Sequence, residues 1–443
     1  RRQLLRDLAS SVHHERRTVE HEFVLAADPV HIHERHARFA DTRLHLVNAL
    51  LIFALLRLLL ALPRAWGQRE RAMLPAFIIS LLWAVHPIQV SSVLYVVQRM
   101  EMLSTTFILL GLLAYVRGRL AQQDGRLGWQ WLLGSVVLAA IGMLSKESAV
   151  LFPAYTLALE LTLLGFEAKS PRTQRWLKIA YATGTVFAVV MFAAWLLPKY
   201  SAPGMFDSRG FSLGERMLSQ LRILPMYIGQ MVLPLPSTLT FYYDTYPKSL
   251  GLLNPATTLA GGLFLAALLF AAWRLRHRSP LISLGILWFF SAHLLTSNVF
   301  NLELVFEHRN YFALLGTLLA LAAAIHLIPM RDGPALKRVA VGAVIVGFGF
   351  LAIMRAATWG NPLTLAMDHA AKNPTSPRAS NDLATIYVGM SDGNADSPFF
   401  SLGKKEFERG SQLDDASPLP EQGLILMAAS ARTPANPQWW DRL

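Results

Sequence analysis

The sequence contains no cysteine among its 443 residues, and only 16% of its residues are charged. The absence of cysteine excludes disulfides, thiolate metal sites and cysteine nucleophiles. The shortage of charge argues against a soluble protein, because 53% of the residues are hydrophobic and little polar surface is left to cover them. The apolar residues also gather in runs of about 20, the length of a helix that crosses a bilayer. The composition predicts an all-α, polytopic membrane protein.

The net charge of +12 comes largely from Lys and Arg residues in short loops between the apolar runs. In a membrane protein such loops set the orientation, since positively charged loops stay on the cytoplasmic side. Basic patches interleaved with aromatic residues, which favour nucleic-acid binding, are absent. The charge therefore indicates topology rather than a nucleic-acid partner.

Ten apolar runs predict about ten membrane-spanning helices. They occupy 44–62, 72–86, 101–116, 129–145, 148–165, 177–197, 254–273, 280–296, 311–329 and 337–354. A further stretch, 214–234, is amphipathic and contains Arg216, Arg222 and Pro225. We interpret it as an interfacial or re-entrant helix.

Every second loop between these runs is basic, and the alternation continues along all ten. The basic residues are Arg64, Arg69, Arg71, Arg117, Arg119, Arg126, Lys169, Arg172, Arg175, Arg274, Arg276, Arg278, Arg331, Lys337 and Arg338. These loops are predicted to face the cytoplasm. The outward loops are then 86–100, 146–147, 198–253 and 297–310, and both ends of the chain also face outward.

The first 43 residues form an atypical polar segment without an apolar run or a signal peptide. Nothing in this segment could carry the amino terminus across a membrane, so we expect at least one upstream helix to be missing from this chain. The segment holds six of the thirteen histidines, including "HIHERH" at 31–36. Their spacing does not place metal ligands on one helical face, and we interpret the segment as a solvated polar stretch.

Beyond the predicted membrane domain, 44–354, the character of the sequence changes. Helical patterns at about 379–390, 403–412 and 419–429 are separated by turn signals such as Asn373-Pro374. Such helix pairs resemble tetratricopeptide-repeat units, which need several copies to bury a core. Since barely more than one copy is present in 355–443, we expect the chain to be truncated at its carboxyl end.

Four clusters in the outward loops contain nearly all the unusual polar residues. They are His86, Gln98, Arg99 and Glu101; Lys146 and Glu147; Tyr242, Tyr243, Asp244 and Tyr246; and Glu307, His308, Arg309 and Tyr311. Taken singly, each has an ordinary explanation, such as a lipid headgroup contact, an interfacial aromatic residue or a snorkelling lysine.

Taken together, the outward cations indicate a ligand. Arg99, Lys146 and Arg309 lie on the side that cations normally avoid, and each has a glutamate close by in the sequence. An anion at the membrane surface would explain this pattern, because Arg offers paired donors to phosphate oxygens and Lys adds a point charge.

Four motifs resemble one family. "HLVNALLIFALLRLLL", "HPIQVSSVLYVVQRMEMLSTTFILLGLLAY", "LSKESAVLFPAYTLALEL" and "EHRNYFALLG" look like the membrane half of the transmembrane and tetratricopeptide-repeat O-mannosyltransferases and their bacterial relatives. The resemblance covers about 44 to 430, weakly after 354. It implies a GT-C-like helical bundle that takes a sugar from a polyprenyl-phosphate donor and passes it to a protein acceptor bound by outward repeats.

Carried over residue by residue, the resemblance places Arg99, Lys146 and Arg309 near the donor phosphate. The sugar-binding or orienting residues would be His86, Glu101, Glu147, Asp244, Glu307, His308 and Tyr311. The family's general base is expected in a loop after a first helix, which we expect to be missing from this chain. Asp28 and Asp41 do not match that loop pattern, so the catalytic residue is left unassigned. No metal site is predicted, although a divalent metal is left open as an assisting ion.

Three alternatives remain open from the sequence. One is a ligase or polymerase that moves glycans from a polyprenyl diphosphate, and another is a non-catalytic membrane-anchored repeat scaffold. A transporter is the third, and Arg57 is its main mid-span candidate. The missing cysteines and short loops suit a bacterial inner membrane, with the outward loops and the carboxyl-terminal repeats in the periplasm.

Overall fold

The computed structural model describes residues 39–328, 333–413 and 417–442. All regular structure in these ranges is helical, and they contain no strand. The histidine-rich stretch 31–36 and Asp28 lie outside the described residues. The prediction of an all-α protein is confirmed for the part of the chain described here.

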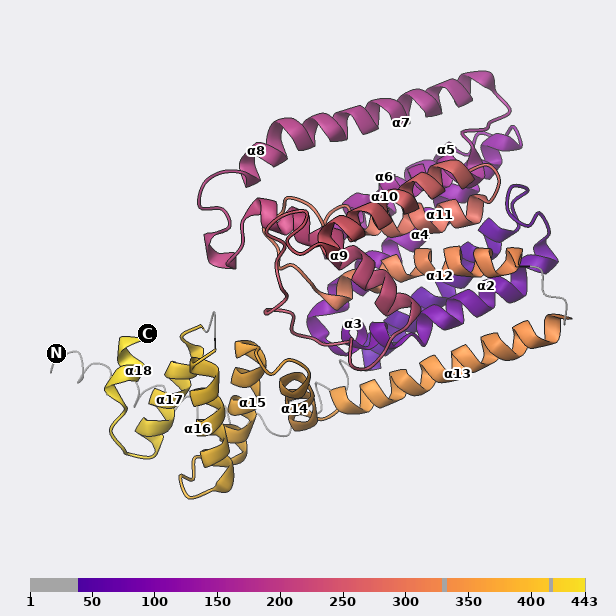
Figure 1. Ribbon diagram of the computed structural model, residues 1–443. Coiled ribbons are helices and arrows are strands. Elements are labelled where there is room, and N and C mark those ends of the chain that lie inside the picture. The colour runs from indigo at the N-terminus through magenta and orange to yellow at the C-terminus, as the bar shows by residue number, and fades with distance from the viewer. Residues whose placement is uncertain (1–38, 329–332, 414–416, 443) are drawn as a thin grey trace.

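Most helices follow one another through short connections, apart from the longer segments 233–256 and 294–306 (Figure 1). After a first helix, Phe39–Leu60, they are α2 Arg69–Ala84, α3 Val90–Leu94, α4 Arg99–Gln123, α5 Trp129–Ser145, α6 Phe152–Leu159, α7 Pro171–Met191, α8 Leu197–Tyr200, α9 Leu213–Val232, α10 Thr257–Leu275, α11 Pro280–His293, α12 Asn310–Leu327, α13 Gly333–Trp359, α14 Pro362–Lys372, α15 Pro377–Met390, α16 Pro398–Ser411, α17 Leu419–Ser430 and α18 Pro437–Asp441. Short 3-10 or π turns link them: η1 Pro87–Gln89, η2 Val96–Gln98, η3 Glu147–Leu151, η4 Glu160–Leu164, η5 Phe192–Leu196, η6 Asp207–Arg209 and η7 Glu307–Arg309.

Each of the ten predicted apolar runs falls on helix. In the described ranges, seven helices are long and apolar enough to cross a membrane, and a bent pair, Glu70–Ala84 with Pro87–Leu94, could make an eighth. The remaining two apolar helices, α5 and α11, have 17 and 14 residues. The structure is therefore compatible with an integral membrane protein of seven or eight full spans plus two shorter apolar helices.

Three of the predicted basic loops, around Arg64, Arg126 and Lys169, meet at one end of the bundle, whereas Arg331 lies outside the described residues. Arg64 forms an ion pair with Glu167, and the Lys169 backbone N–H donates to the Gln122 carbonyl over 3.1 Å. Helices α2, α7 and α13 all begin at this end, whereas α14 to α18 lie beyond the other (Figure 1). The alternation of basic and outward loops thus matches the two ends, while the side of the membrane that each end faces stays a prediction.

The charge pattern suggested that Arg119 is a loop residue, and this prediction is wrong. Arg119 lies within α4 and is fully buried, as is its partner Glu160. The two side chains are 2.6 Å apart, and Glu160 also accepts from the Tyr115 hydroxyl and the Phe166 backbone. Every oxygen of this carboxylate has a donor, which offsets the cost of burying the charge.

The helix predicted at 214–234 corresponds to α9, and its interfacial or re-entrant placement stays a prediction. Polar side chains of α9 are buried against the bundle. Arg216 is fully buried and donates to backbone carbonyls of the 296–303 segment, including Asn298 at 2.8 Å and Thr296 at 2.6 Å. Tyr227, also buried, exchanges hydrogen bonds with the backbone of Phe306. Helix α9 therefore fixes the outward segment that follows α11.

Helices α11 and α12 approach closely through two glycines. A Cβ on Gly316 would lie 2.5 Å from the Gly285 carbonyl oxygen, and a Cβ on Gly285 would lie 2.4 Å from the Gly316 oxygen. Small residues at such crossings let backbones pack where lipid gives no hydrophobic driving force. This contact sets the position of η7, because η7 leads directly into α12.

The carboxyl-terminal helices α14 to α18, called here the C-terminal unit, begin at Pro362. Four of the five start with Pro after a capping side chain, from Asn361, Ser376, Ser397 or Asn436. The predicted helices at 379–390, 403–412 and 419–429 correspond to α15, α16 and α17. The expected boundary at 354 lies too early, because α13 continues to Trp359 before the break at Gly360.

Candidate functional site

A pocket of about 200 Å³ lies at the end of the bundle opposite the basic loops, and we call it the anion pocket. It is lined by Glu101, Lys146, Glu147, Ser148, Leu151, Arg209, Ala292, Leu295, Thr296, Leu302, Glu303, Phe306, His308 and Arg309. Three cations and three carboxylates therefore face one small space. Five of the sequence-predicted site residues are among them: Glu101, Lys146, Glu147, His308 and Arg309.

The turn after α5 places Lys146 and Glu147. Helix α5 ends at Ser145, Lys146 is extended, and η3 begins at Glu147, so the two side chains leave a tight corner. The Lys146 ammonium lies 3.0 Å from the Glu101 carboxylate and 3.3 Å from the Gln98 amide oxygen. Both ionic side chains are nearly buried, which strengthens their attraction.

The segment 303–309, which ends in η7, forms the opposite wall. Arg309 donates to the carbonyls of Leu304 and Glu303 over 2.9 and 2.8 Å, and its guanidinium lies over the Phe306 ring. The His308 ring packs beside the same phenyl ring, with centroids 4.9 Å apart. Through these hydrogen bonds Arg309 folds the segment 303–309 back on itself, and its side chain also lines the pocket.

Glu303 connects the anion pocket to two further arginines. Its carboxylate lies 3.6 Å from Arg209, which also lines the pocket, and 2.8 Å from Arg378 of α15. Arg209 donates in addition to the Asn301 side chain over 3.1 Å. Glu303 is therefore shared between the pocket and the C-terminal unit.

The three carboxylates of the pocket differ in their partners. Glu101 is paired with Lys146, and Glu303 is paired with Arg209 and Arg378. Among the described residues, the Glu147 carboxylate makes no hydrogen bond or ion pair. Only Glu147 has both oxygens available to an incoming hydroxyl.

Arg99 does not line the anion pocket. Its guanidinium lies 2.5 and 3.1 Å from the two oxygens of Asp41, whose side chain is 1% exposed. The glutamates adjacent in sequence are not the partners of Arg99 and Arg309, because neighbouring residues on a helical turn point in different directions. Arg99 pairs with Asp41, and Arg309 with backbone carbonyls, although Glu101 and Glu307 lie closer in the sequence.

Three other predicted residues lie in structural positions. His86 is buried and contacts the Met231 carbonyl over 3.0 Å. Tyr311 is fully buried, with its hydroxyl 3.0 Å from His45 and 3.1 Å from Asn48. The Asp244 carboxylate accepts from the Ser376 hydroxyl over 2.8 Å, at the start of α15. None of the three predicted residues lines the anion pocket.

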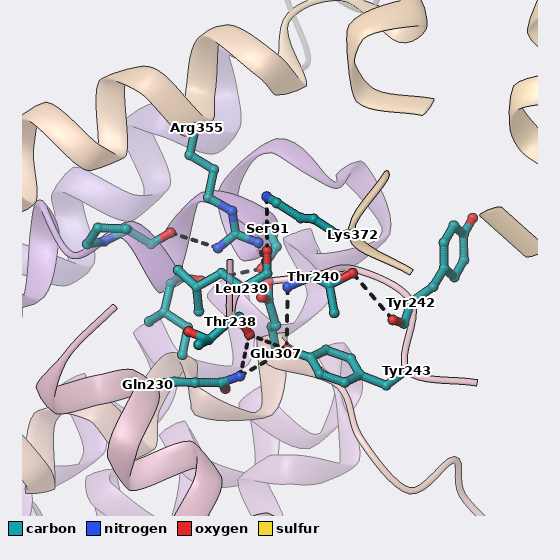
Figure 2. Close-up of polar contacts among 12 residues, drawn as sticks. Ser91, Gln230, Thr238, Leu239, Thr240, Tyr242, Tyr243, Glu307, Arg355 and Lys372 are labelled. Carbon is teal, nitrogen blue, oxygen red and sulfur yellow. Dashed lines mark hydrogen bonds and ion pairs between the residues drawn. The ribbon is translucent and has the colours of Figure 1, made fainter. Parts of the chain in front are cut away.

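Glu307 does not line the anion pocket and is buried, and Figure 2 shows its side chain near Arg355. Its Oε2 accepts from Arg355 over 2.5 Å, and the same guanidinium donates to the Pro87 carbonyl over 3.0 Å. Within the described residues, Glu307 Oε1 has no hydrogen-bond partner. The Glu-His-Arg triplet therefore faces two ways, with Glu307 toward α13 and the other two toward the pocket.

The sequence reasoning missed Arg209, Glu303 and Arg355. Arg209 and Glu303 lie in loops predicted to face outward. The argument from an outward cation, which singled out Arg99 and Arg309, applies equally to Arg209. Arg355 follows the last apolar run, and helix α13 continues through it. All three are charged residues within or next to segments predicted to face outward, but none of them lies in one of the four motifs.

The described residues contain no group of three or more His, Asp or Glu side chains placed to hold a metal ion. A larger hollow of about 580 Å³ lies over the loop between α8 and α9 and is wide open. Its acidic residues, Asp207 and Glu215, lie among small and aromatic ones, and Glu215 is engaged in capping α9. The anion pocket is the better place for a charged ligand.

No protein-family model, no curated protein and no solved structure matches this chain. What the arrangement can do must therefore come from its chemistry. Lys146, Arg209 and Arg309 can bind an anion, and Glu147 can accept a proton beside it.

Proposed function

We propose that the chain is a membrane glycosyltransferase that takes a sugar from a polyprenyl-phosphate donor and transfers it to a protein acceptor on the extracytoplasmic side. The observation that supports this proposal is the convergence of Lys146, Arg209 and Arg309 in one pocket, at the end of an apolar helical bundle opposite its basic loops. In a bacterial cell the membrane would be the inner membrane and the outward side the periplasm.

The size and lining of the anion pocket fit a lipid headgroup. Its volume of about 200 Å³ is below the roughly 300 to 1,000 Å³ of sites that enclose a drug-sized ligand. A phosphate with part of a sugar can enter it, while a long apolar chain must remain outside in the membrane. The apolar side chains of Leu151, Ala292 and Leu295 on its lining are compatible with a headgroup that continues into lipid.

The transfer step follows from the roles of these residues. The acceptor hydroxyl oxygen attacks the anomeric carbon of the sugar, and the bond from that carbon to the phosphate oxygen breaks. The bond electrons leave with the phosphate, whose growing negative charge is stabilised by Lys146, Arg209 and Arg309. The hydroxyl proton passes to the Glu147 carboxylate, which is the pocket carboxylate without another partner. The products are a glycosylated acceptor and polyprenyl phosphate.

Donor binding tests the proposal. We expect Lys146→Gln and Arg209→Gln each to weaken binding of a polyprenyl-phosphate hexose by about 10- to 100-fold, since hydrogen bonds to charged groups contribute about 1.5–3 kcal/mol. Lys404→Gln removes the same charge from α16 and should bind like the parent. The measurement is titration of the protein in lipid nanodiscs with the donor lipid.

Equal binding by the parent and both pocket variants would contradict the proposal and favour a scaffold. Binding followed by transfer of a chain of sugars, rather than one sugar, would identify a glycan ligase or polymerase instead.

A further inference from the structure

The segment 303–309, one wall of the anion pocket, is bound at both ends by arginines that belong to the carboxyl-terminal part of the chain. Arg378, in the first turn of α15, contacts Glu303 at 2.8 Å. Arg355, near the end of α13, contacts Glu307 at 2.5 Å (Figure 2). Four residues apart, the two glutamates bracket the part of the wall whose carbonyls bind Arg309.

The contact at Glu307 is the more buried of the two. The Arg355 and Glu307 side chains are 10% and 2% exposed, and Arg355 also donates to the Pro87 carbonyl. Charge-assisted hydrogen bonds in such surroundings are short and strong, and removal of one partner leaves a buried charge unpaired. Arg355 therefore links α13, η1 and η7 at one point.

The contact at Glu303 is more exposed and is shared. Arg378 is half-exposed, and the Glu303 carboxylate also faces Arg209 in the pocket. The backbone carbonyl of Glu303 accepts from Arg309. A displacement of Arg378 thus acts on the partners of two of the three pocket cations.

The C-terminal unit is itself docked on the outward loop before α10, so that it can act on the wall as one body. The Tyr242 hydroxyl donates to Asp382, Asp244 accepts from Ser376, and the Lys372 ammonium donates to the Leu239 carbonyl over 3.3 Å. Burial raises the pKa of Asp382, which the Tyr242 hydrogen bond and Arg378 partly oppose.

We propose that Arg355 and Arg378 are positioning residues, through which the C-terminal unit sets the geometry of the anion pocket. Arg378 belongs to the C-terminal unit, and Arg355 lies in the last part of α13, which leads into it. A protein that binds the C-terminal unit then changes the anion affinity of the pocket by moving the 303–309 wall. The identity of the anion rests on the proposed function, but the mechanical link rests on the two ion pairs alone.

The test uses the absence of cysteine. Thr296→Cys introduces one thiol into the pocket lining, and its rate of labelling by a soluble thiol reagent reports how open the pocket is. We expect Arg378→Gln to raise this rate by about 2- to 30-fold, the range that corresponds to typical coupling energies. Arg378→Lys, which keeps the charge, should restore most of the parent rate.

Arg442→Gln is the matched control, because Arg442 lies in the C-terminal unit and contacts Ser411 and Glu421 instead of the wall. Arg355→Lys tests the second ion pair. Lysine keeps a charge opposite Glu307 but lacks the guanidinium fork that also binds the Pro87 carbonyl, so this variant should also raise the rate. Parent-like labelling in both Arg378→Gln and Arg355→Lys would overturn the proposal.

Inorganic phosphate separates this proposal from the proposed function. If the pocket binds phosphate, phosphate should protect the thiol in the Thr296→Cys parent, and more weakly in Arg378→Gln. Absence of protection in the parent would count against an anion pocket, whereas the labelling rates without phosphate still decide the link to the C-terminal unit.

Discussion

Glu147 differs from the other pocket carboxylates in having no partner among the described residues. A general base needs a free lone pair within hydrogen-bond reach of the hydroxyl that it deprotonates. Glu101 and Glu303 are already paired with cations, so an incoming hydroxyl would have to compete with those cations for their oxygens. At the scale of single residues, the pocket carboxylates therefore differ in role according to whether a cation already neutralises them.

We expect Glu147→Gln to lower the rate of sugar transfer by about 10²- to 10⁴-fold, the usual contribution of a general base. Donor binding should change little, because the amide keeps the size of the side chain. Transfer rate and donor affinity are measured on the same preparation, with Glu70→Gln at the basic end as the control.

A different base would give a different pattern. If Asp41→Asn abolishes transfer without weakening donor binding while Glu147→Gln keeps the parent transfer rate, the buried Asp41 beside Arg99 is the proton acceptor and the assignment to Glu147 is wrong.

The sequence predicts most of the site at this scale but not its pairings. Loop charge placed Lys146, Glu147 and Arg309 on one side, and the structure brings them into one pocket. Arg355 was missed because the apolar run ends before it, although Ala356 and Ala357 continue the helix to Gly360. Charge partners depend on helix packing, which hydropathy does not encode.

At the scale of elements, the crossing of α11 and α12 fixes the pocket wall. Neither Gly285 nor Gly316 has room for a side chain, since each faces the backbone of the other helix. Gly184 of α7, by contrast, has no atom within 4 Å of where its Cβ would be. Gly316 and Gly184 therefore provide a matched pair for substitution by alanine, one at a close helix crossing and one with open space around it.

We expect Gly316→Ala to destabilise the protein by about 1–3 kcal/mol, because the added methyl forces the two helices apart. The shift should also weaken donor binding, since η7 moves with α12. Gly184→Ala should be neutral or slightly stabilising, as alanine is the better helix former. Thermal unfolding in detergent measures both variants. Equal melting temperatures would show that the crossing tolerates a wider spacing.

Hydropathy predicted where the helices lie more accurately than what they pack against. The run at 148–165 corresponds to one span, Glu147–Leu164, built from η3, α6 and η4. The stretch 214–234 is helical as predicted, and both polar and apolar side chains of α9, such as Gln220 and Ile223, are buried against protein. An apolar stripe has the same pattern whether lipid or another helix covers it.

At the scale of the whole molecule, the docking of the C-terminal unit depends on a neutral histidine. His369 of α14 is buried and stacks on Phe241, with ring centroids 5.4 Å apart. Burial lowers the pKa of His369 to about 4, which Asp368 partly opposes and Lys372 and Arg355 reinforce. A protonated imidazole would be unfavourable at this interface.

We therefore expect the docked state to be fully stable above pH 6.5 and to weaken as the pH falls from 6.5 toward 4. In that window the released histidine binds a proton and the docked one does not, which costs up to about 3 kcal/mol. Hydrogen exchange of α14 amides at pH 7.5 and pH 5 measures the effect. His369→Phe should remove the pH dependence, and an unchanged dependence would assign it to another group.

Helix α7 has no buried residue, and it continues through η5 and α8 as one helix, Pro171–Tyr200, of 30 residues. At 1.5 Å per residue this helix is about 45 Å long, against a hydrocarbon core of about 30 Å. A helix that exceeds the bilayer tilts, and the tilt changes with membrane thickness. Because only the loop 201–206 and the start of η6 separate Tyr200 from Arg209, we expect the thickness of the surrounding lipid to act on a pocket cation.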